Sequence, residues 1–207
     1  MTPQSILAIG AHPDDIELGV GGSIAKFTEA GIAVRAVVLT KGEVGNRHSL
    51  DRVGETTKAL KLLGVQDIHT MDFPDTRLHS RMTDIITYIE EHMKAVTPDR
   101  VYTMFVDDQH QDHRAVFEAS IVACRAARQI VCYETPSCWS NFQPHMFEPI
   151  DEAIFDKKVA ALTLHESQRD RPYTQPSAMR VKVQSRGQQV GVDYAEAFIG
   201  YKFVLSH

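Results

Sequence analysis

Residues 6–22, ILAIGAHPDDIELGVGG, join a short apolar run, a charged turn and a glycine-rich segment. An apolar run that ends at a turn is typical of a buried strand in a parallel sheet. The following segment, 17–31, has small and apolar residues at the spacing of a helix that packs closely on such a sheet, and Gly31 can end it. The stretch therefore predicts the first strand, turn and helix of an α/β fold, with a histidine and two aspartates in the turn.

The alternation of strand and helix continues along the chain. Further strands are predicted at 33–42, 67–73, 100–106 and 129–135, and helices at 51–64, 81–96, 114–128, 151–168 and 177–191. Alternation with short connections is the signature of a parallel sheet that carries helices on both faces. We therefore predict a single α/β domain over residues 1–207, with a mostly parallel sheet and a less regular C-terminal third at 136–207.

The composition limits the kinds of partner. A chain of 207 residues with 43% hydrophobic residues can build one domain with a sizeable core. Its net charge of −5 does not favour nucleic acid or an anionic membrane as the main partner. We see no apolar run near the roughly 18 residues of a spanning helix, no basic signal-peptide segment, and three cysteines without C-x-x-C spacing. We therefore expect a cytoplasmic protein.

Two clusters of histidine and aspartate follow predicted strands. Residues 12–15, HPDD, follow the first strand, and residues 107–113, DDQHQDH, follow the fourth. Because open parallel sheets bind ligands at the carboxyl ends of their strands, we expect the two clusters to face each other across one crevice. Residues three apart, such as His110 and His113, project from the same side of a helical turn.

These residue types and spacings predict a metal site. A histidine and an aspartate of the first cluster, with a histidine of the second, make three ligands and leave a position for water, as in catalytic zinc sites. A zinc ion lowers the pKa of bound water to about 7, and Asp14, beside Asp15, is then placed to act as the general base. Asp112 is a candidate to orient one of the imidazoles. His110, if it is not a ligand, would be an imidazolium that stabilises an oxyanion or protonates the leaving amine.

Other interpretations of these residues stay open. Two aspartates after a strand are also typical of a helix N-cap without a metal. Two histidines and a carboxylate also form the ligand set of iron(II) oxygenases, and a sugar- or nucleotide-binding module is a third hypothesis. The glycines at 19–22 do not match G-x-G-x-x-G, so close packing of helix on sheet is their better interpretation.

Three residues outside the clusters are weaker candidates. Arg47 and Arg52 could bind a substrate carboxylate or phosphate, although Arg47 is more simply a solvated surface residue. Arg52 could equally pair with Glu55 on one helix. Trp139, the single tryptophan, would either line a sugar-binding face or serve as a buried anchor.

The motif AHPDDIELGVGG at 11–22, together with HQDH at 110–113, resembles the LmbE-like (PIG-L) family of zinc-dependent N-acetylglucosamine deacetylases. Supporting segments are TKGE at 40–43, RVGE at 52–55, FPDTRL at 73–78, YETPS at 133–137, SQ at 167–168 and YAEAF at 194–198. The resemblance therefore covers nearly the whole chain. Gln111 stands where the family usually has proline, which should alter the rigidity of the turn rather than the ligands.

The resemblance implies a role for each site residue. His12, Asp15 and His113 would hold zinc, Asp14 would be the general base, His110 would stabilise the oxyanion, Asp112 would tune His110, and Arg52 would contact substrate. It also implies a Rossmann-like fold, with 136–207 completing the substrate pocket, and a homo-oligomer, either a hexamer or a trimer. The implied substrate is a small amino-sugar conjugate that loses its acetyl group, although related members cleave an amide in thiol conjugates. Iron(II) can occupy such sites in place of zinc.

Overall fold

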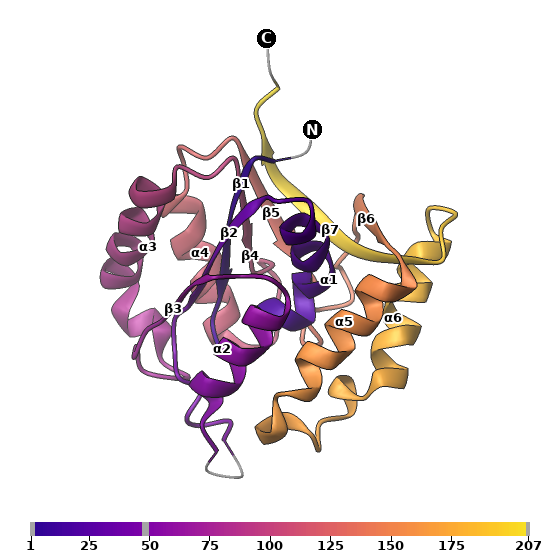
Figure 1. The fold of residues 1–207 in the computed structure, drawn as a ribbon. Coiled ribbons are helices and arrows are strands. Elements are labelled where there is room, and N and C mark those ends of the chain that lie inside the picture. The colour runs from indigo at the N-terminus through magenta and orange to yellow at the C-terminus, as the bar shows by residue number, and fades with distance from the viewer. Residues whose placement is uncertain (1–2, 47–49, 206–207) are drawn as a thin grey trace.

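The strands form one mixed sheet. The computed structural model describes residues 3–46 and 50–205, and seven strands within these ranges lie in the order β3-β2-β1-β4-β5-β7-β6 (Figure 1). They are β1 Ser5–Gly10, β2 Ala33–Val38, β3 Asp67–Thr70, β4 Arg100–Thr103, β5 Gln129–Tyr133, β6 Met146–Ile150 and β7 Tyr194–Phe203. Strands β1 to β5 run parallel, and β7 is antiparallel to both β5 and β6. The predicted mostly parallel α/β sheet is confirmed, whereas β6 and β7 were not predicted.

Helices cover both faces of the sheet. They are α1 Asp15–Glu29, α2 Arg52–Leu62, α3 Met82–Val96, α4 Gln111–Ala123, α5 Glu152–Thr163 and α6 Pro176–Gln188. Helices α1, α2 and α5 pack together on one face, α3 and α4 pack on the other, and α6 lies against β7 (Figure 1). Among the helices in the described residues, none is both long enough and apolar enough to cross a membrane.

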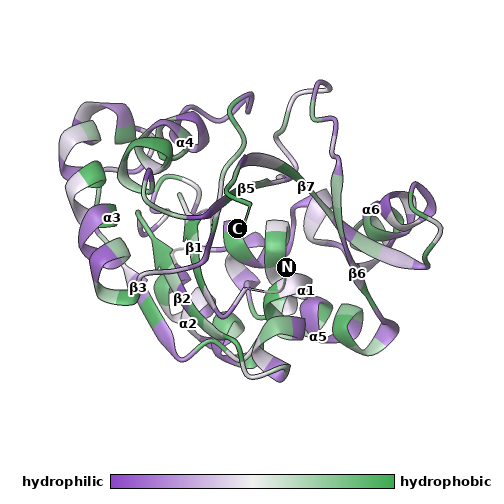
Figure 2. Cartoon of the chain, turned by 90° about the horizontal axis from the view of Figure 1, so that it is seen from above, coloured by the Kyte–Doolittle hydropathy of each residue, from purple (hydrophilic) through white to green (hydrophobic). Residues whose placement is uncertain are grey.

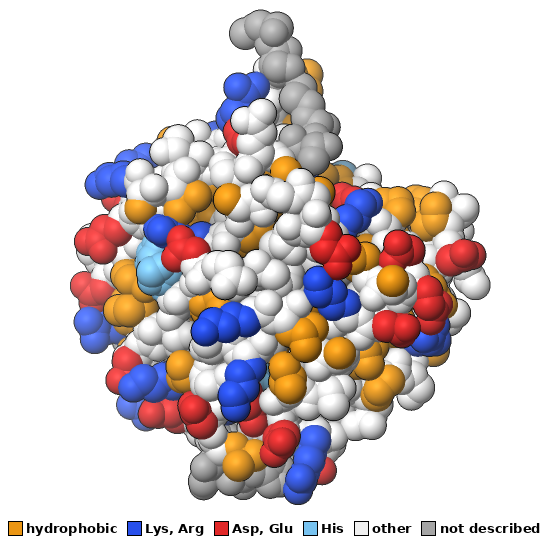
Figure 3. Space-filling view, in the orientation of Figure 1, with side chains coloured by type: hydrophobic (Ala, Val, Ile, Leu, Met, Phe, Trp, Pro, Cys, Tyr) orange, Lys and Arg blue, Asp and Glu red, His pale blue; other side chains and the backbone are white. Residues whose placement is uncertain are grey.

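The central strands are the core of the molecule. Seen from above, they are coloured as hydrophobic between helices that also carry hydrophilic residues (Figure 2). Residues 6–9 of β1 are completely buried, because a parallel strand covered on both faces has apolar side chains on both sides. On the surface drawn in Figure 3, basic and acidic side chains are interspersed.

Strand β1 is the point at which the chain stops adding strands on one side of the sheet and starts adding them on the other. The chain proceeds from β1 to β2 on one side, and β4 then pairs with the other side of β1, with Ile6 beside Arg100 and Ala8 beside Tyr102. In open α/β sheets the crevice outside such a switch point is where ligands bind. The turns that follow β1 and β4 carry the two histidine–aspartate clusters, so the topology brings them together.

The glycines of α1 let this helix lie close to the sheet. A Cβ atom at Gly19 would lie 2.1 Å from the Tyr133 ring on β5, and one at Gly22 would lie 3.0 Å from Glu196 on β7. The Tyr133 ring is completely buried and its hydroxyl donates to the Ile9 carbonyl at 2.8 Å, so it has little room to move. The packing interpretation of these glycines is confirmed.

A buried ion pair joins the C-terminal third to α1. Lys158 of α5 pairs with Glu196 of β7 and also donates to the Leu18 carbonyl at 2.8 Å. Glu196 in turn accepts the backbone N–H groups of Gly22 at 2.8 Å and Ser23 at 2.7 Å. Because these buried charges satisfy one another, they join α5 and β7 to α1 within one domain. With β6, α5, α6 and β7, residues 136–205 are also more regular than predicted.

The contact between Gly19 and Tyr133 can be tested by adding one methyl group. We expect Gly19→Ala to lower the free energy of unfolding by about 1–3 kcal/mol, because the methyl group overlaps a buried ring. In the matched control Gly21→Ala, the new Cβ atom has a flexible Leu63 methyl group 3.3 Å away as its nearest neighbour, so a change within about 1 kcal/mol is expected. Urea unfolding measures both. Equal effects of the two substitutions would contradict the close packing.

Candidate active site

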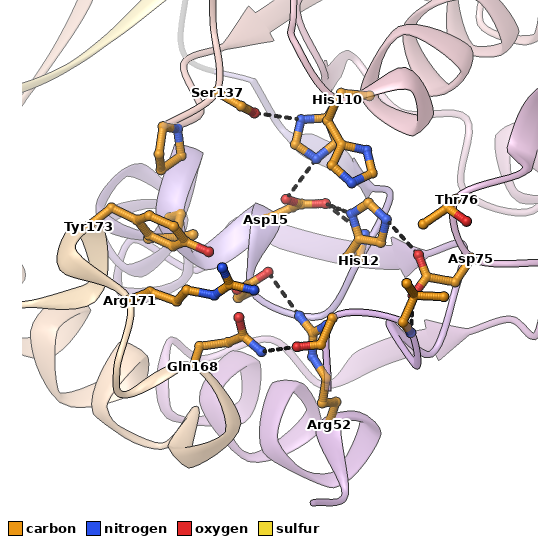
Figure 4. A pocket seen from close by; sticks show the side chains of 16 residues that line it. His12, Asp15, Arg52, Asp75, Thr76, His110, Ser137, Gln168, Arg171 and Tyr173 are labelled. Carbon is orange, nitrogen blue, oxygen red and sulfur yellow. Dashed lines mark hydrogen bonds and ion pairs between the residues drawn. The ribbon is translucent and has the colours of Figure 1, made fainter. Parts of the chain in front are cut away.

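A cavity of about 350 Å³ opens at the carboxyl end of the sheet, between the turns after β1 and β4. Both predicted clusters line it, and the rings of His12 and His110 lie 4.6 Å apart while those of His110 and His113 lie 4.8 Å apart (Figure 4). The expectation that the clusters face each other across one crevice is confirmed. Gln168, Arg171 and Tyr173, from the C-terminal third, complete one wall of the cavity.

Asp15 lies between two of the three imidazoles. Its Oδ2 atom is 3.3 Å from His12 Nδ1, and its Oδ1 atom is 3.3 Å from His113 Nε2. One ring nitrogen from each of His12, His110 and His113 lies within 4.8 Å of the others. Imidazole nitrogens and a carboxylate gathered in this way are the donor set that zinc and other divalent transition metals prefer.

The second nitrogen of each flanking imidazole faces a buried carboxylate. His12 Nε2 lies 3.2 Å from both Asp75 Oδ1 and Asp112 Oδ2, and His113 Nδ1 lies 2.9 Å from Asp108 Oδ2. A carboxylate behind an imidazole fixes the ring orientation and the tautomer, and it leaves the other nitrogen for a metal. The nitrogens left in this way are the two that face Asp15.

The Asp112 carboxylate contacts His12, one of the imidazoles it was expected to orient, and not His110, which the resemblance implies that it tunes. The carboxylate is fully buried against His12 and accepts backbone N–H groups from Thr76 at 2.6 Å and Leu78 at 3.1 Å. Only its own backbone N–H reaches His110, donating to Nδ1 at 3.2 Å. The same hydrogen bond makes His110 the N-cap of α4, which is why this helix begins at Gln111, three residues earlier than predicted.

The sequence did not indicate a role for two of the carboxylates that orient the imidazoles, Asp108 and Asp75. Asp108 is part of the second cluster and is completely buried, whereas its neighbour Asp107 is exposed and accepts from Asn141. Asp75 belongs to the loop after β3 and also accepts the backbone N–H of Val44 at 2.7 Å. The neighbouring residues in the sequence do not indicate which of Asp107 and Asp108 is buried. Only the fold decides this, because it places Asp108 against His113.

The charges of the cluster favour a cation at its centre. Burial alone would lower the pKa of His113, but Asp15 and Asp108 outweigh it and raise that pKa to about 9. The pKa of His12 is likewise raised against burial, chiefly by Asp112, Asp15 and Asp75. Carboxylates that stabilise positive charge on these imidazoles also favour a metal cation bound among them. The donor set and its charge therefore both fit a divalent metal.

Asp14 has a strained backbone and a perturbed carboxyl group. Its φ of 105° lies in the left-handed region, which costs a residue with a Cβ atom about 1–3 kcal/mol and is common at functional sites. Its side chain is buried and lines the cavity beside Asp15. Burial raises the pKa of the Asp14 carboxyl to about 6, Asp15 adds to this, and Arg52 opposes it.

Arg52 is held largely by protein partners. Its guanidinium donates to the carbonyls of Gly42 at 2.7 Å and Pro13 at 2.6 Å, and lies 3.4 Å from Asp14 Oδ1. It lines the cavity, so the expected contact with substrate stays a prediction, but the observed contacts fix the turn that carries Asp14. Glu55 bonds with Ser167 at 2.6 Å instead of pairing with Arg52.

The two remaining candidates from the sequence are Trp139 and Arg47. Trp139 is 55% exposed, so the buried-anchor interpretation is wrong, and it is not among the described residues that line the cavity. Arg47 lies outside the described residues.

Comparisons with known proteins agree with this site. The family model of GlcNAc-PI de-N-acetylase (PIG-L) matches residues 7–124, a range that includes both clusters. The uncharacterized deacetylase YaiS of Escherichia coli K12 is 48% identical over 169 residues, covering 79% of this chain and 91% of that protein. The diacetylchitobiose deacetylase of Thermococcus kodakarensis is 29% identical over 191 residues, covering 80% of this chain and 70% of that protein. The conserved protein TT1542 of Thermus thermophilus has the same fold, with a TM-score of 0.82 at 26% identity over 98% of this chain and 96% of that one.

The fold and the site thus define an enzyme with a cluster of metal-ligating residues at the switch point of an α/β sheet. The chain belongs to the PIG-L, or LmbE-like, deacetylase family. It is accordingly a hydrolase of amide bonds, which replaces the hypotheses of an oxygenase and of a non-enzymatic binding module.

The carboxylate behind His113 can be tested through metal affinity. We expect Asp108→Asn to weaken Zn²⁺ binding by about 10–100-fold, because the ring of His113 loses its anionic partner. The matched control is Asp107→Asn, the exposed neighbour, which should bind Zn²⁺ like the parent protein. Competition with a chromogenic zinc chelator measures both, and circular dichroism checks the folding of each variant. Unchanged affinity in folded Asp108→Asn would contradict this role.

Proposed function

We propose that this enzyme removes the acetyl group from a small N-acetylglucosaminyl conjugate, with Zn²⁺ held by His12, Asp15 and His113. The observation that carries the proposal is the pairing of a perturbed carboxyl group, Asp14, with the buried His–Asp–His arrangement beside it. The PIG-L family match and the diacetylchitobiose deacetylase relative support an amino sugar as the substrate. Cytoplasmic localisation and a homo-oligomer stay predictions.

The proposed metal ligands follow from which nitrogens of His12 and His113 the surrounding carboxylates leave available for a metal. His12 Nδ1 and His113 Nε2 face Asp15, while their other nitrogens are engaged by Asp112, Asp75 and Asp108. When bound, Zn²⁺ would polarise the amide carbonyl and lower the pKa of water. The same donors would also accept iron(II), so metal analysis of the purified protein decides between the two.

Asp14 is the proposed general base. A base works best when its pKa lies near the working pH, and burial brings the pKa of the Asp14 carboxyl to about 6. At neutral pH the group is mostly ionised, so it can take a proton from water and later deliver it to the leaving amine. Arg52 and the left-handed backbone of Asp14 hold the Asp14 carboxylate beside Asp15. Unlike the Asp15 carboxylate, it does not lie between the two imidazoles.

His110 is the proposed donor to the oxyanion. Burial lowers the pKa of His110, and the neighbouring rings of His12 and His113 lower it further, which favours the neutral ring over the imidazolium at neutral pH. Because His110 Nδ1 accepts the Asp112 N–H, a neutral ring carries its proton on Nε2. That N–H can donate to the carbonyl oxygen as negative charge develops there.

The proposed reaction is tested with a panel of N-acetylglucosaminides, by measuring the primary amine that is released. We expect Asp14→Asn to lower kcat by about 10²–10⁴-fold, the usual contribution of a general base, while the zinc content stays unchanged. Asp72→Asn is the matched control, because Asp72 follows β3 at the same edge of the sheet but is exposed and bonded to Lys41.

Two results would contradict the proposal. Full turnover by zinc-loaded Asp14→Asn would remove Asp14 from the reaction. Hydrolysis of another N-acyl substrate, with none of the N-acetylglucosaminides, would show that the substrate class is wrong.

A further inference from the structure

Arg171 is a cation on the cavity wall without a partner among the residues that the structure describes. It lines the cavity, and its side chain points into it from the side opposite Asp75 (Figure 4). Its guanidinium makes no hydrogen bond or ion pair with any residue in the described ranges 3–46 and 50–205. A guanidinium carries five N–H donors and stays charged at any working pH, so this group is available to a ligand.

The other charged groups on the cavity wall are already engaged. Arg52 is bound by Gly42, Pro13 and Asp14. Asp15 and Asp75 face His12, and Asp75 also accepts a backbone N–H from the 41–46 loop. With a divalent metal among the imidazoles, Arg171 is the cation of the described cavity lining that these contacts leave without a counter-charge.

The backbone around Arg171 is fixed, so the side chain starts from a defined position. The Arg171 N–H donates to the Gln168 carbonyl at 2.9 Å, and the Arg171 carbonyl accepts the N–H of Thr174 at 3.1 Å and its hydroxyl at 2.8 Å. The Gln175 side chain donates to the Arg169 carbonyl at 2.8 Å. These bonds close a compact turn on the cavity wall, with Arg171 and Tyr173 both lining the cavity.

We propose that Arg171 binds an acidic group, a carboxylate or a phosphate, on the aglycone of the substrate, so that the enzyme prefers anionic N-acetylglucosaminyl conjugates. This inference rests on the proposed function, because the acetamido group must lie at the His–Asp–His cluster for the aglycone to reach this wall. A guanidinium binds carboxylate and phosphate oxygens with two parallel N–H donors, which makes it selective as well as attractive. Arg171 is then a specificity-determining residue and takes no part in the chemical step.

The test compares N-acetylglucosaminides whose aglycone is neutral with ones whose aglycone carries an acidic group. The substrates are methyl N-acetylglucosaminide, the matched glycoside of glycolic acid, and the matched 2-phosphoethyl glycoside. We expect a kcat/KM at least about tenfold higher for one or both acidic glycosides than for the methyl glycoside, since a charge-assisted hydrogen bond is lost with the neutral group. The two acidic substrates show whether carboxylate or phosphate is preferred.

Arg171→Gln should remove this preference by lowering kcat/KM for the acidic glycosides only, and Arg171→Lys should restore part of it. The matched control is Arg169→Gln, which removes the same charge two residues away, where the side chain is 67% exposed and lies 3.9 Å from Asp170. This control should keep the preference. A wild-type enzyme without preference, or an equal loss for all three substrates in Arg171→Gln, would overturn the proposal.

Calorimetry with the deacetylated products separates this proposal from the proposed function. If no N-acetylglucosaminide is hydrolysed, but an acidic glucosaminide binds more tightly than the methyl glucosaminide and Arg171→Gln abolishes the difference, the proposed function fails and the role of Arg171 stands. Equal binding of the acidic and neutral products by the wild-type protein would overturn the role of Arg171, whatever the enzyme hydrolyses.

Discussion

The contact of Asp15 with two imidazoles is the constraint on which the rest of the site depends. His12 and His113 come from turns far apart in the sequence, and each turns one nitrogen to Asp15 and the other to a buried carboxylate. So many carboxylates cannot be buried together unless positive charge compensates them. A divalent cation would supply that charge, so the electrostatics of this corner of the fold also favour metal chemistry there.

The fold brings these groups together and gives each of them different contacts. The switch point between β1 and β4 makes the two turns neighbours, and glycines in α1 let the first helix begin close to the sheet. Arg52 then binds the turn of Asp14, whereas Arg171 is the cation that we propose to meet the aglycone of the substrate. The two arginines on one cavity thus have different surroundings, because among the described residues only Arg52 is bound by protein oxygens.

The sequence predicted what depends on local spacing and missed what depends on distant contacts. The three-residue spacing of His12 and Asp15 placed both on one turn, and the strand-ending positions predicted that the clusters would meet. The partner of Asp112 could not be predicted, because it depends on how the loop at Thr76 folds over α4. Strand β6 was missed because it is a short, partly exposed edge strand that contains Pro149, which does not match the pattern of a buried strand.

Anomalous diffraction at the zinc absorption edge, from crystals grown with Zn²⁺, tests the central claim most directly. The arrangement predicts one peak at bonding distance, about 2.0–2.2 Å, from His12 Nδ1, an Asp15 oxygen and His113 Nε2, with Asp14 and His110 outside the ligand set. A peak ligated by His110 in place of Asp15, or no peak at this cluster, would contradict the claim that Asp15 and its two imidazoles form the metal centre.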